Sequence, residues 1–293
     1  MSRDEYVLAT DSCCDLPADL ADELGLTVLR FPFTVDGEPH FDDLGRSMTP
    51  AQFYGAMRGG SAPTTAQVPM TEYLSAFSKA AQADVPLLFL SFSSGLSGTF
   101  DTALVARDSV LVEHPAARIR VIDTLGASAL QGLLVLEAAR RRGAGATFDE
   151  LGDWVEANRL RANGYFTIDS LEALRRGGRV SDLAALAGSV LDVKPILRVN
   201  AGGELVVDRP VRGRKKSLRA LADIFADKTN GSAQQTMIVA HGDARDEALA
   251  LVVLLRERAA VQEVLIFDVG PVIGSHTGPG MVAAVFWGEE RDS

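Results

Sequence analysis

The sequence predicts an α/β protein with an N-terminal domain whose parallel sheet is flanked by helices, followed by a C-terminal α+β domain. The chain has 293 residues, which is comfortable for two domains of ordinary size. Through the first half, short β-rich runs alternate with helical patterns, as in a parallel sheet covered on both faces. From about residue 164, hairpins are mixed with helices, which indicates an α+β domain. We place the boundary near residue 160, giving domains 1–160 and 161–293.

The elements of the first half follow from their composition. Apolar, β-rich runs predict strands, and the pair Asp36-Gly37 predicts a turn that ends an extended segment. Thr49 and Pro50 suit the N-cap and first position of a helix, and we expect Asp15 to open an earlier one. The expected strands cover 6–10, 27–35, 85–92 and 118–123, and the expected helices cover 17–23, 50–57 and 128–142.

The second half is assigned in the same way. The turn Ala201-Gly202-Gly203 separates two β-rich runs and predicts a hairpin. The expected strands cover 165–169, 195–199, 204–211, 236–241, 264–269 and 281–286; the expected helices cover 182–191, a segment from Ser217, and 246–259.

Composition narrows the class of function. A hydrophobic fraction of 47% with 23% charged residues is that of a folded globular protein. The net charge of −10 argues against nucleic acid or an anionic membrane surface as a partner. The basic stretch 209–219 is interpreted as a solvated turn and helix start, with a sensor of phosphorylated ligands as a weaker alternative.

Other features point to the cytoplasm. The adjacent Cys13 and Cys14 have neither disulfide nor metal-ligand spacing, which suits a reducing compartment. The first ten residues lack an apolar signal-peptide core. The uncharged stretch 269–288 is interrupted by glycines and prolines, so we expect no integral membrane association.

Hydroxyl-rich loops follow several predicted strands. In SFSSGLSGTF (91–100), we expect Ser97 at the cap of a helix that starts near Gly98, where free N–H groups suit an anion. Ligands of open α/β sheets bind beyond the carboxyl ends of the strands. Helix capping by Ser97 is the plain alternative. Similar polar segments occur at 10–15, 62–69, 122–128 and 274–280, the last with His276 in a glycine-rich loop. Together these segments predict a polar floor made mostly of neutral donors.

Complete catalytic or metal motifs are missing from the sequence. The run Gly95 to Thr99 lacks the last glycine of a nucleophile elbow, and neither a dinucleotide fingerprint nor a phosphate-binding P-loop is present. The four histidines have no metal-ligand spacing. An acyl hydrolase or transferase that uses Ser97 and His276 is therefore unsupported, but it stays open as the alternative function.

Seven segments, in this order, resemble the DegV family of fatty-acid-binding proteins over about residues 5–288: TDSCCDLP, APTTAQVP, FSSGLSGTF, VIDTLGAS, LEALRRGGRVS, LDVKPIL and GSHTGPG. The resemblance implies two domains with a long-chain fatty acid, such as palmitate, in a tunnel between them. It implies a lipid carrier of bacterial lipid metabolism that needs no cofactor or metal, not an enzyme.

The resemblance also implies site residues. Thr65 and Ser97 would hydrogen-bond the lipid carboxylate, and a protonatable His276 would lie close to it. Ser93, Ser94 and Gly98 belong to the same motif as Ser97 and are expected at the site. The chain departs from the family pattern at Ala66 and Val68, which stand where the family has serine and proline, so one hydroxyl beside the expected headgroup site is absent.

Arginines follow the segment LEAL. In family members that serve a fatty-acid kinase, the arginine matching Arg179 is expected at the contact with the kinase, which would phosphorylate the carboxylate to an acyl phosphate. Arg175 and Arg176 lie in the same turn and are assigned to this docking surface. The alternative is a helix end that favours cations, with the glycine pair 177–178 as its C-cap.

Overall fold

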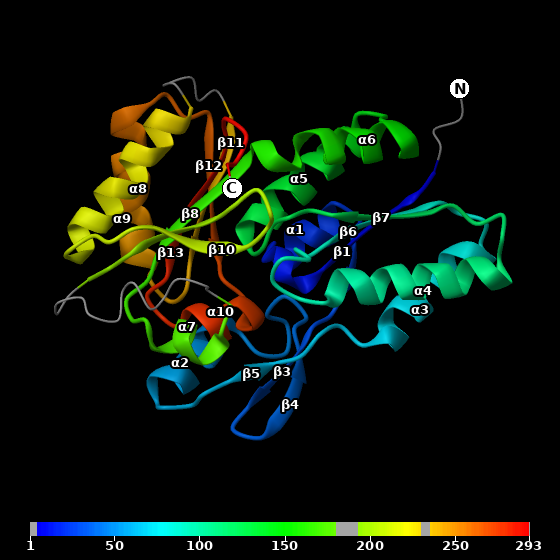
Figure 1. Cartoon of the computed structure of the whole chain (residues 1–293), viewed down its shortest axis with the longest axis horizontal. Coiled ribbons are helices and arrows are strands. Elements are labelled where there is room, and N and C mark those ends of the chain that lie inside the picture. Colours follow the sequence, from blue (N-terminus) through cyan, green and yellow to red (C-terminus); the bar gives the residue numbers. More distant parts are fainter. Residues whose placement is uncertain (1–4, 180–192, 230–234, 293) are drawn as a thin grey trace.

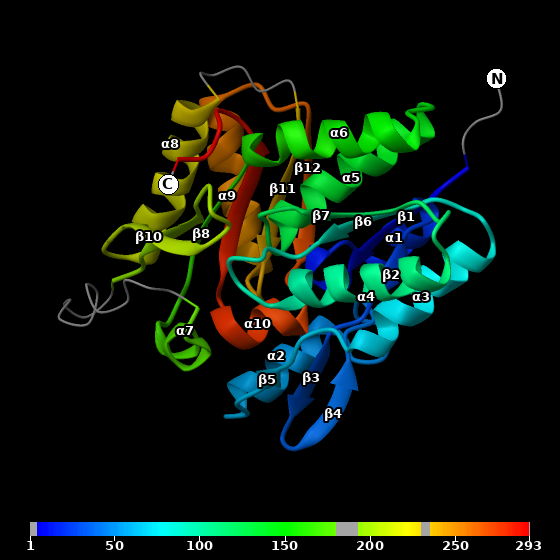
Figure 2. The same cartoon turned by 45° about the vertical axis from the view of Figure 1, so that its right-hand side comes forward.

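The computed structural model describes residues 5–179, 193–229 and 235–292. The helix expected at 182–191 lies outside the described residues. Each half of the chain builds one main sheet, and a small third sheet lies beside them (Figures 1 and 2). This is the predicted combination of a parallel sheet flanked by helices with a separate, sheet-rich C-terminal part.

The first sheet has four strands in the order β2-β1-β6-β7, and each neighbouring pair is parallel. Every residue of β6 is buried, as expected for a parallel strand that is covered on both faces. The strands are β1 (Val7–Asp11), β2 (Thr27–Leu29), β6 (Leu87–Ser91) and β7 (Ile119–Asp123), and the short 3-10 helix η1 (Ser12–Cys14) follows β1.

Helices cover both faces of this sheet. On one face, α3 (Met70–Gln82) and α4 (Thr99–Glu113) pack with Phe77 and Phe89 in one apolar core. On the other face, α5 (Ala129–Gly143) packs against Leu88 and Leu90 in a second core, which also includes residues of α6 (Phe148–Asn158). The short helix α1 (Ala18–Glu23) has Pro17 as its N-cap, so the expectation that Asp15 opens it is wrong.

The second sheet has six strands in the order β10-β9-β8-β13-β11-β12. Only β11 and β12 pair in parallel among these neighbours; the other pairs are antiparallel. The predicted hairpin is confirmed, since β9 and β10 flank residues 201–203. The strands are β8 (Ala162–Thr167), β9 (Ile196–Val199), β10 (Leu205–Arg209), β11 (Thr236–His241), β12 (Glu263–Asp268) and β13 (Val282–Trp287).

The second sheet lies between α5 and a pair of helices. Ala283 and Val285 of β13 share a core with α5, whereas α8 (Arg214–Lys228) and α9 (Arg245–Arg258) pack with Phe225 and Phe286 on the opposite face. Helix α5 thus contacts both sheets, which joins the two halves through one core (Figure 1). The first sheet ends at Asp123 and the second begins at Ala162, after the 3-10 turn η2 (Arg159–Arg161). A division near residue 160 stays a prediction.

A third sheet, in the order β4-β3-β5, carries part of the functional site. Residues 27–35 were expected as one extended segment, but they form two strands, β2 and β3 (Pro32–Val35). Strand β3 pairs with β4 (Glu38–Phe41) across the turn Asp36-Gly37, and it also pairs with β5 (Thr64–Thr65). Helix α2 (Pro50–Arg58) begins after Thr49 with a full capping box, as predicted. The short helices α7 (Glu172–Gly177) and α10 (Pro271–Thr277) lie close by (Figure 2).

Within the described ranges, every helix is too short or too polar to cross a membrane.

Candidate functional site

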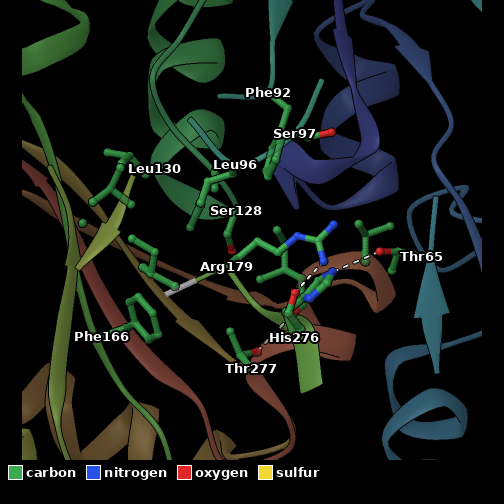
Figure 3. Close-up of a pocket in the computed structure, with 18 of the residues that line it drawn as sticks. Thr65, Phe92, Leu96, Ser97, Ser128, Leu130, Phe166, Arg179, His276 and Thr277 are labelled. Carbon is green, nitrogen blue, oxygen red and sulfur yellow. Dashed lines mark hydrogen bonds between the residues drawn. The ribbon is translucent and has the colours of Figure 1, made fainter. Parts of the chain in front are cut away.

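A cavity of about 520 Å³ lies between the two main sheets, and both halves of the chain line it (Figure 3). It lies beyond the carboxyl end of β6, where the loop 92–98 begins. Its apolar wall includes Phe92, Leu96, Leu130, Phe166, Val199 and Leu205. Figure 3 shows Leu130 and Phe166 on one side of the cavity and Thr65, His276 and Arg179 on the other. The cavity therefore has an apolar end and a polar end.

Thr65 and His276 meet at the polar end. The Nε2 atom of His276 lies 3.0 Å from Thr65 Oγ1. Thr65 is held there by the pairing of β5 with Phe33 of β3. His276 lies in the last turn of α10. The segment just before α10 is fixed by the Tyr54 hydroxyl, which donates to the carbonyl of Val269 at 3.0 Å. The expectation that His276 lies in a loop is corrected: Pro271 starts a helix and Gly278 ends it.

The imidazole of His276 is neutral near pH 7. Burial, together with the nearby Arg179 cation, lowers the pKa of His276 to about 4. The sequence predicts a protonatable His276, but with this pKa the imidazole stays uncharged near pH 7. Its Nδ1 atom is buried without a hydrogen-bond partner and faces Gly177, where a β-carbon would clash with the ring. The first glycine of the pair 177–178 thus makes room for His276, and Gly178, with φ +64°, is the C-cap of α7.

Ser97 and Gly98 also line the cavity. Ser97 Oγ lies 2.9 Å from Thr99 Oγ1 and accepts from the Thr99 N–H at 3.2 Å. The N-cap of α4 is Gly98 and not Ser97, so the predicted cap is shifted by one residue. Ser97 nevertheless lines the same wall as Gln67, a residue for which no role was predicted.

Ser93 and Ser94 lie outside the cavity wall. The Ser93 hydroxyl is buried and donates to the carbonyl of Gly203 at 2.7 Å, which fixes the β9–β10 hairpin to the loop after β6. Ser94 is exposed, and its backbone N–H donates to Asp123 at 3.3 Å. The Ser93 hydroxyl and the Ser94 N–H thus have partners within the protein, and neither serine lines the cavity.

The polar residues at the other strand ends either line the cavity or make hydrogen bonds within the protein. Ser128 lines the cavity together with Thr65 and His276. Asp11 instead accepts from the Phe92 N–H at 2.8 Å, and Thr124 donates to the carbonyl of Ser91 at 2.7 Å. Some residues of the predicted polar floor therefore make internal hydrogen bonds that fix the loops, and others line the cavity.

Of the three arginines after the segment LEAL, one lines the cavity and two lie on α7. Arg179 lines the cavity while remaining exposed, and it donates to the carbonyl of Gly177 at 2.5 Å. Arg175 and Arg176 lie exposed on α7, where Arg176 pairs with Glu172 at 3.2 Å. Figure 3 shows Arg179 among the polar residues of the cavity, near Ser128 and His276, a position that spacing alone did not indicate. The docking role of all three arginines stays a prediction.

The geometry does not assemble a catalytic centre from Ser97 and His276. The hydroxyl of Ser97 has Thr99 as its partner, and His276 Nε2 has Thr65. Among the residues that the structure describes, no group of three or more His, Cys, Asp or Glu side chains could hold a metal ion. The site is arranged for holding a molecule with an apolar part and a polar end.

Comparisons with known proteins agree with this arrangement. A sequence profile described as "Uncharacterised protein, DegV family" matches residues 6–289. A DegV domain-containing protein of Clostridium perfringens is 39% identical over 288 residues, which cover 98% of this chain and 99% of the relative. A DegV domain-containing protein of Streptococcus pyogenes serotype M1 is 34% identical over 285 residues, 97% of this chain and 98% of the relative.

Solved structures are similar over nearly the whole chain. A DegV lipid-binding protein from Thermotoga maritima has a TM-score of 0.86 at 27% identity, covering 98% of this chain and 100% of that one. A fatty-acid-binding DegV family protein from Thermus thermophilus has a TM-score of 0.84 at 28% identity, covering 97% and 100%. A fatty-acid-binding DegV family protein from Streptococcus agalactiae has a TM-score of 0.85 at 28% identity, covering 98% and 99%.

Proposed function

The chain belongs to the DegV family, and we propose that it binds a long-chain free fatty acid, such as palmitate, in the cavity between its two sheets. The observation that carries the proposal is the division of this cavity: Thr65, Ser97 and His276 line its polar side, and most of its other lining side chains are apolar. The fatty-acid binding of the related proteins from Thermus thermophilus and Streptococcus agalactiae supports it.

The apolar wall supplies affinity. Burying a methylene is worth roughly 0.8 kcal/mol, so about 14 methylenes offer on the order of 11 kcal/mol before the costs of ordering and association. A tail inserted toward Leu130 and Phe166 would contact buried apolar side chains.

The headgroup is held mainly by neutral donors. A buried carboxylate needs several hydrogen bonds or a positive partner, because otherwise it takes up a proton. We assign the N–H of neutral His276 to Nε2, from which it donates to Thr65 Oγ1; the Thr65 hydroxyl hydrogen is then free to bond the carboxylate. Ser97 is the second donor, and the Arg179 guanidinium, at the margin of the same end, adds a cation.

The protein acts as a carrier that presents the carboxylate to a fatty-acid kinase, which phosphorylates it to an acyl phosphate. The position of Arg179 supports the contact with a kinase, because Arg179 lines the cavity and is also exposed to an approaching partner. Arg175 and Arg176 extend the exposed basic surface beside it. The carrier needs no cofactor and works in the cytoplasm, where the buried thiols of Cys13 and Cys14 stay reduced.

Native mass spectrometry of the protein purified from cells tests the proposal. We expect a co-bound mass of one long-chain fatty acid, and reloading with palmitate after the lipid is stripped. A covalent serine probe and p-nitrophenyl esters separate carrier from hydrolase: labelling of Ser97 with turnover that is lost in Ser97→Ala would favour the enzyme instead.

A further inference from the structure

Asp15 is a buried carboxyl group whose contacts lie on two walls of the site. It follows η1 with φ 51°, an uncommon conformation for an aspartate, and its side chain is 5% exposed. Its N–H donates to the carbonyl of Ser12 at 3.2 Å, so the backbone closes a tight turn here. The carboxyl group lies between Ser128 of the N-terminal half and Gly270 of the C-terminal half.

One oxygen of Asp15 contacts the N-terminal half. The Ser128 hydroxyl donates to Asp15 Oδ2 at 2.5 Å. Ser128 lines the cavity directly before α5 and has φ 56° and ψ −144°, a backbone conformation that costs a non-glycine residue free energy unless its surroundings fix it. The bond to Asp15 is a contact that fixes it.

The other oxygen contacts the C-terminal half. The N–H of Gly270 donates to Asp15 Oδ1 at 3.0 Å. Gly270 is the N-cap of α10, the helix whose last turn carries His276. The approach is close: a β-carbon on Gly270 would lie 2.6 Å from Asp15 Oδ1. The position of the start of α10 therefore depends on this carboxyl group.

We propose that Asp15 is a positioning residue of the fatty-acid site. It holds Ser128 on one wall and the start of α10 on the other, and through α10 it places His276 against Thr65. This inference rests on the proposed function for its effect on lipid affinity, but its effect on His276 exists in the lipid-free protein as well.

The experiment compares Asp15→Ala, Asp15→Asn and the control Asp42→Asn. Asp42 is a neighbouring buried carboxyl group that accepts from the Leu44 N–H at 3.1 Å, whereas Ser128 and the Gly270 N–H donate to Asp15. Asp42→Asn therefore controls for the loss of a buried carboxyl group. Two quantities are measured: the imidazole ¹⁵N shifts of His276 in lipid-free protein, and the dissociation constant for palmitate.

We expect Asp15→Ala to shift the His276 signals and to weaken palmitate binding at least tenfold. Asp15→Asn keeps an oxygen for Gly270 and should restore most of both properties, and Asp42→Asn should leave both near wild type. Native His276 signals in folded Asp15→Ala would overturn the inference, and so would equal changes in Asp42→Asn.

Two further outcomes, a variant that does not fold and a wild-type protein that binds no palmitate, can be told apart from a failure of the inference. If Asp15→Ala does not fold, Gly270→Ala takes its place, because its β-carbon would lie 2.6 Å from Asp15 Oδ1 and force the carboxyl group and the start of α10 apart. Unchanged His276 signals in folded Gly270→Ala would overturn the inference. If the wild-type protein binds no palmitate, the proposed function fails, while the His276 signals still decide whether Asp15 positions α10.

Discussion

His276 Nε2 lies 3.0 Å from Thr65 Oγ1, although 211 residues separate them in the chain. Thr65 comes from the small sheet built on β3, and His276 comes from α10 of the C-terminal half. This contact joins the two halves of the chain at the polar end of the cavity.

Thr65→Val and Ser97→Ala should each weaken palmitate binding by about 1–3 kcal/mol, because each leaves a buried carboxylate oxygen without a donor. Isothermal titration calorimetry measures the loss. Ser94→Ala is the matched control, since Ser94 is exposed and outside the cavity. Normal affinity in the Thr65→Val, Ser97→Ala double variant would place the headgroup elsewhere.

Gly177→Ala should displace the imidazole of His276, because the added methyl group would enter the space that Nδ1 occupies. We expect both lower palmitate affinity and changed His276 ¹⁵N shifts. Gly143→Ala, at the end of α5, meets nothing within 4 Å and should be neutral in both assays. Unchanged His276 shifts in folded Gly177→Ala would show that the ring has room to move.

Arg179→Ala should raise the pKa of His276 from about 4, since the Arg179 cation is one of the two causes that lower it. Burial is the larger cause, so the pKa should stay below the ordinary value of 6.5. A ¹H–¹⁵N titration of the imidazole measures the change. Arg175→Ala, on the exposed face of α7, should have no effect.

The same Arg179→Ala variant should slow acyl-phosphate formation by a fatty-acid kinase more than it weakens lipid binding. The lipid-loaded protein is the substrate in this assay, and the rate is measured at saturating palmitate. Arg118→Ala is the control, because Arg118 precedes β7 at the end of the sheet away from the cavity. Equal rates for both variants would remove Arg179 from the docking surface.

Buried carboxyl groups should make stability fall as pH rises. Burial raises the pKa of Asp42 to about 7, so between about pH 4 and 7 the folded state keeps a proton that the unfolded state has released. The free energy of unfolding then falls by about 1.4 kcal/mol per pH unit for this group. His276, with its lowered pKa, contributes the opposite slope below pH 6.5.

Asp42→Asn isolates the effect of the carboxyl group. The difference in free energy of unfolding between the Asp42→Asn variant and the wild type, measured in urea titrations, should increase steadily from pH 4 to pH 7. A flat difference for Asp42→Asn would mean that Asp42 is ionised throughout.

Much of the fold was predictable because the local signals agree with it. The strand at 236–241 and the helix that starts at Pro50 have the predicted positions, since apolar β-rich composition and a Thr-Pro start are local features. The helical character of residues 271–277 was missed because glycines dominated the interpretation, although Pro271 and Gly278 are ordinary start and stop signals.

The site was predictable only in part, for physical reasons. Hydroxyls at strand ends singled out Thr65 and Ser97, but the same signal selected Ser93, whose partner Gly203 belongs to a distant hairpin. The apolar wall uses the same residue types as the core, so Leu130 and Leu133 cannot be told apart in sequence even though only the first lines the cavity. Such assignments depend on contacts between the two halves.

The most direct test of the account is a nuclear Overhauser experiment on the protein loaded with palmitate that is ¹³C-labelled at C2. The account predicts contacts from the C2 protons to the methyl group of Thr65 and the imidazole of His276. Contacts from C2 to Leu130 and Phe166 instead, or a spectrum of free palmitate, would contradict it.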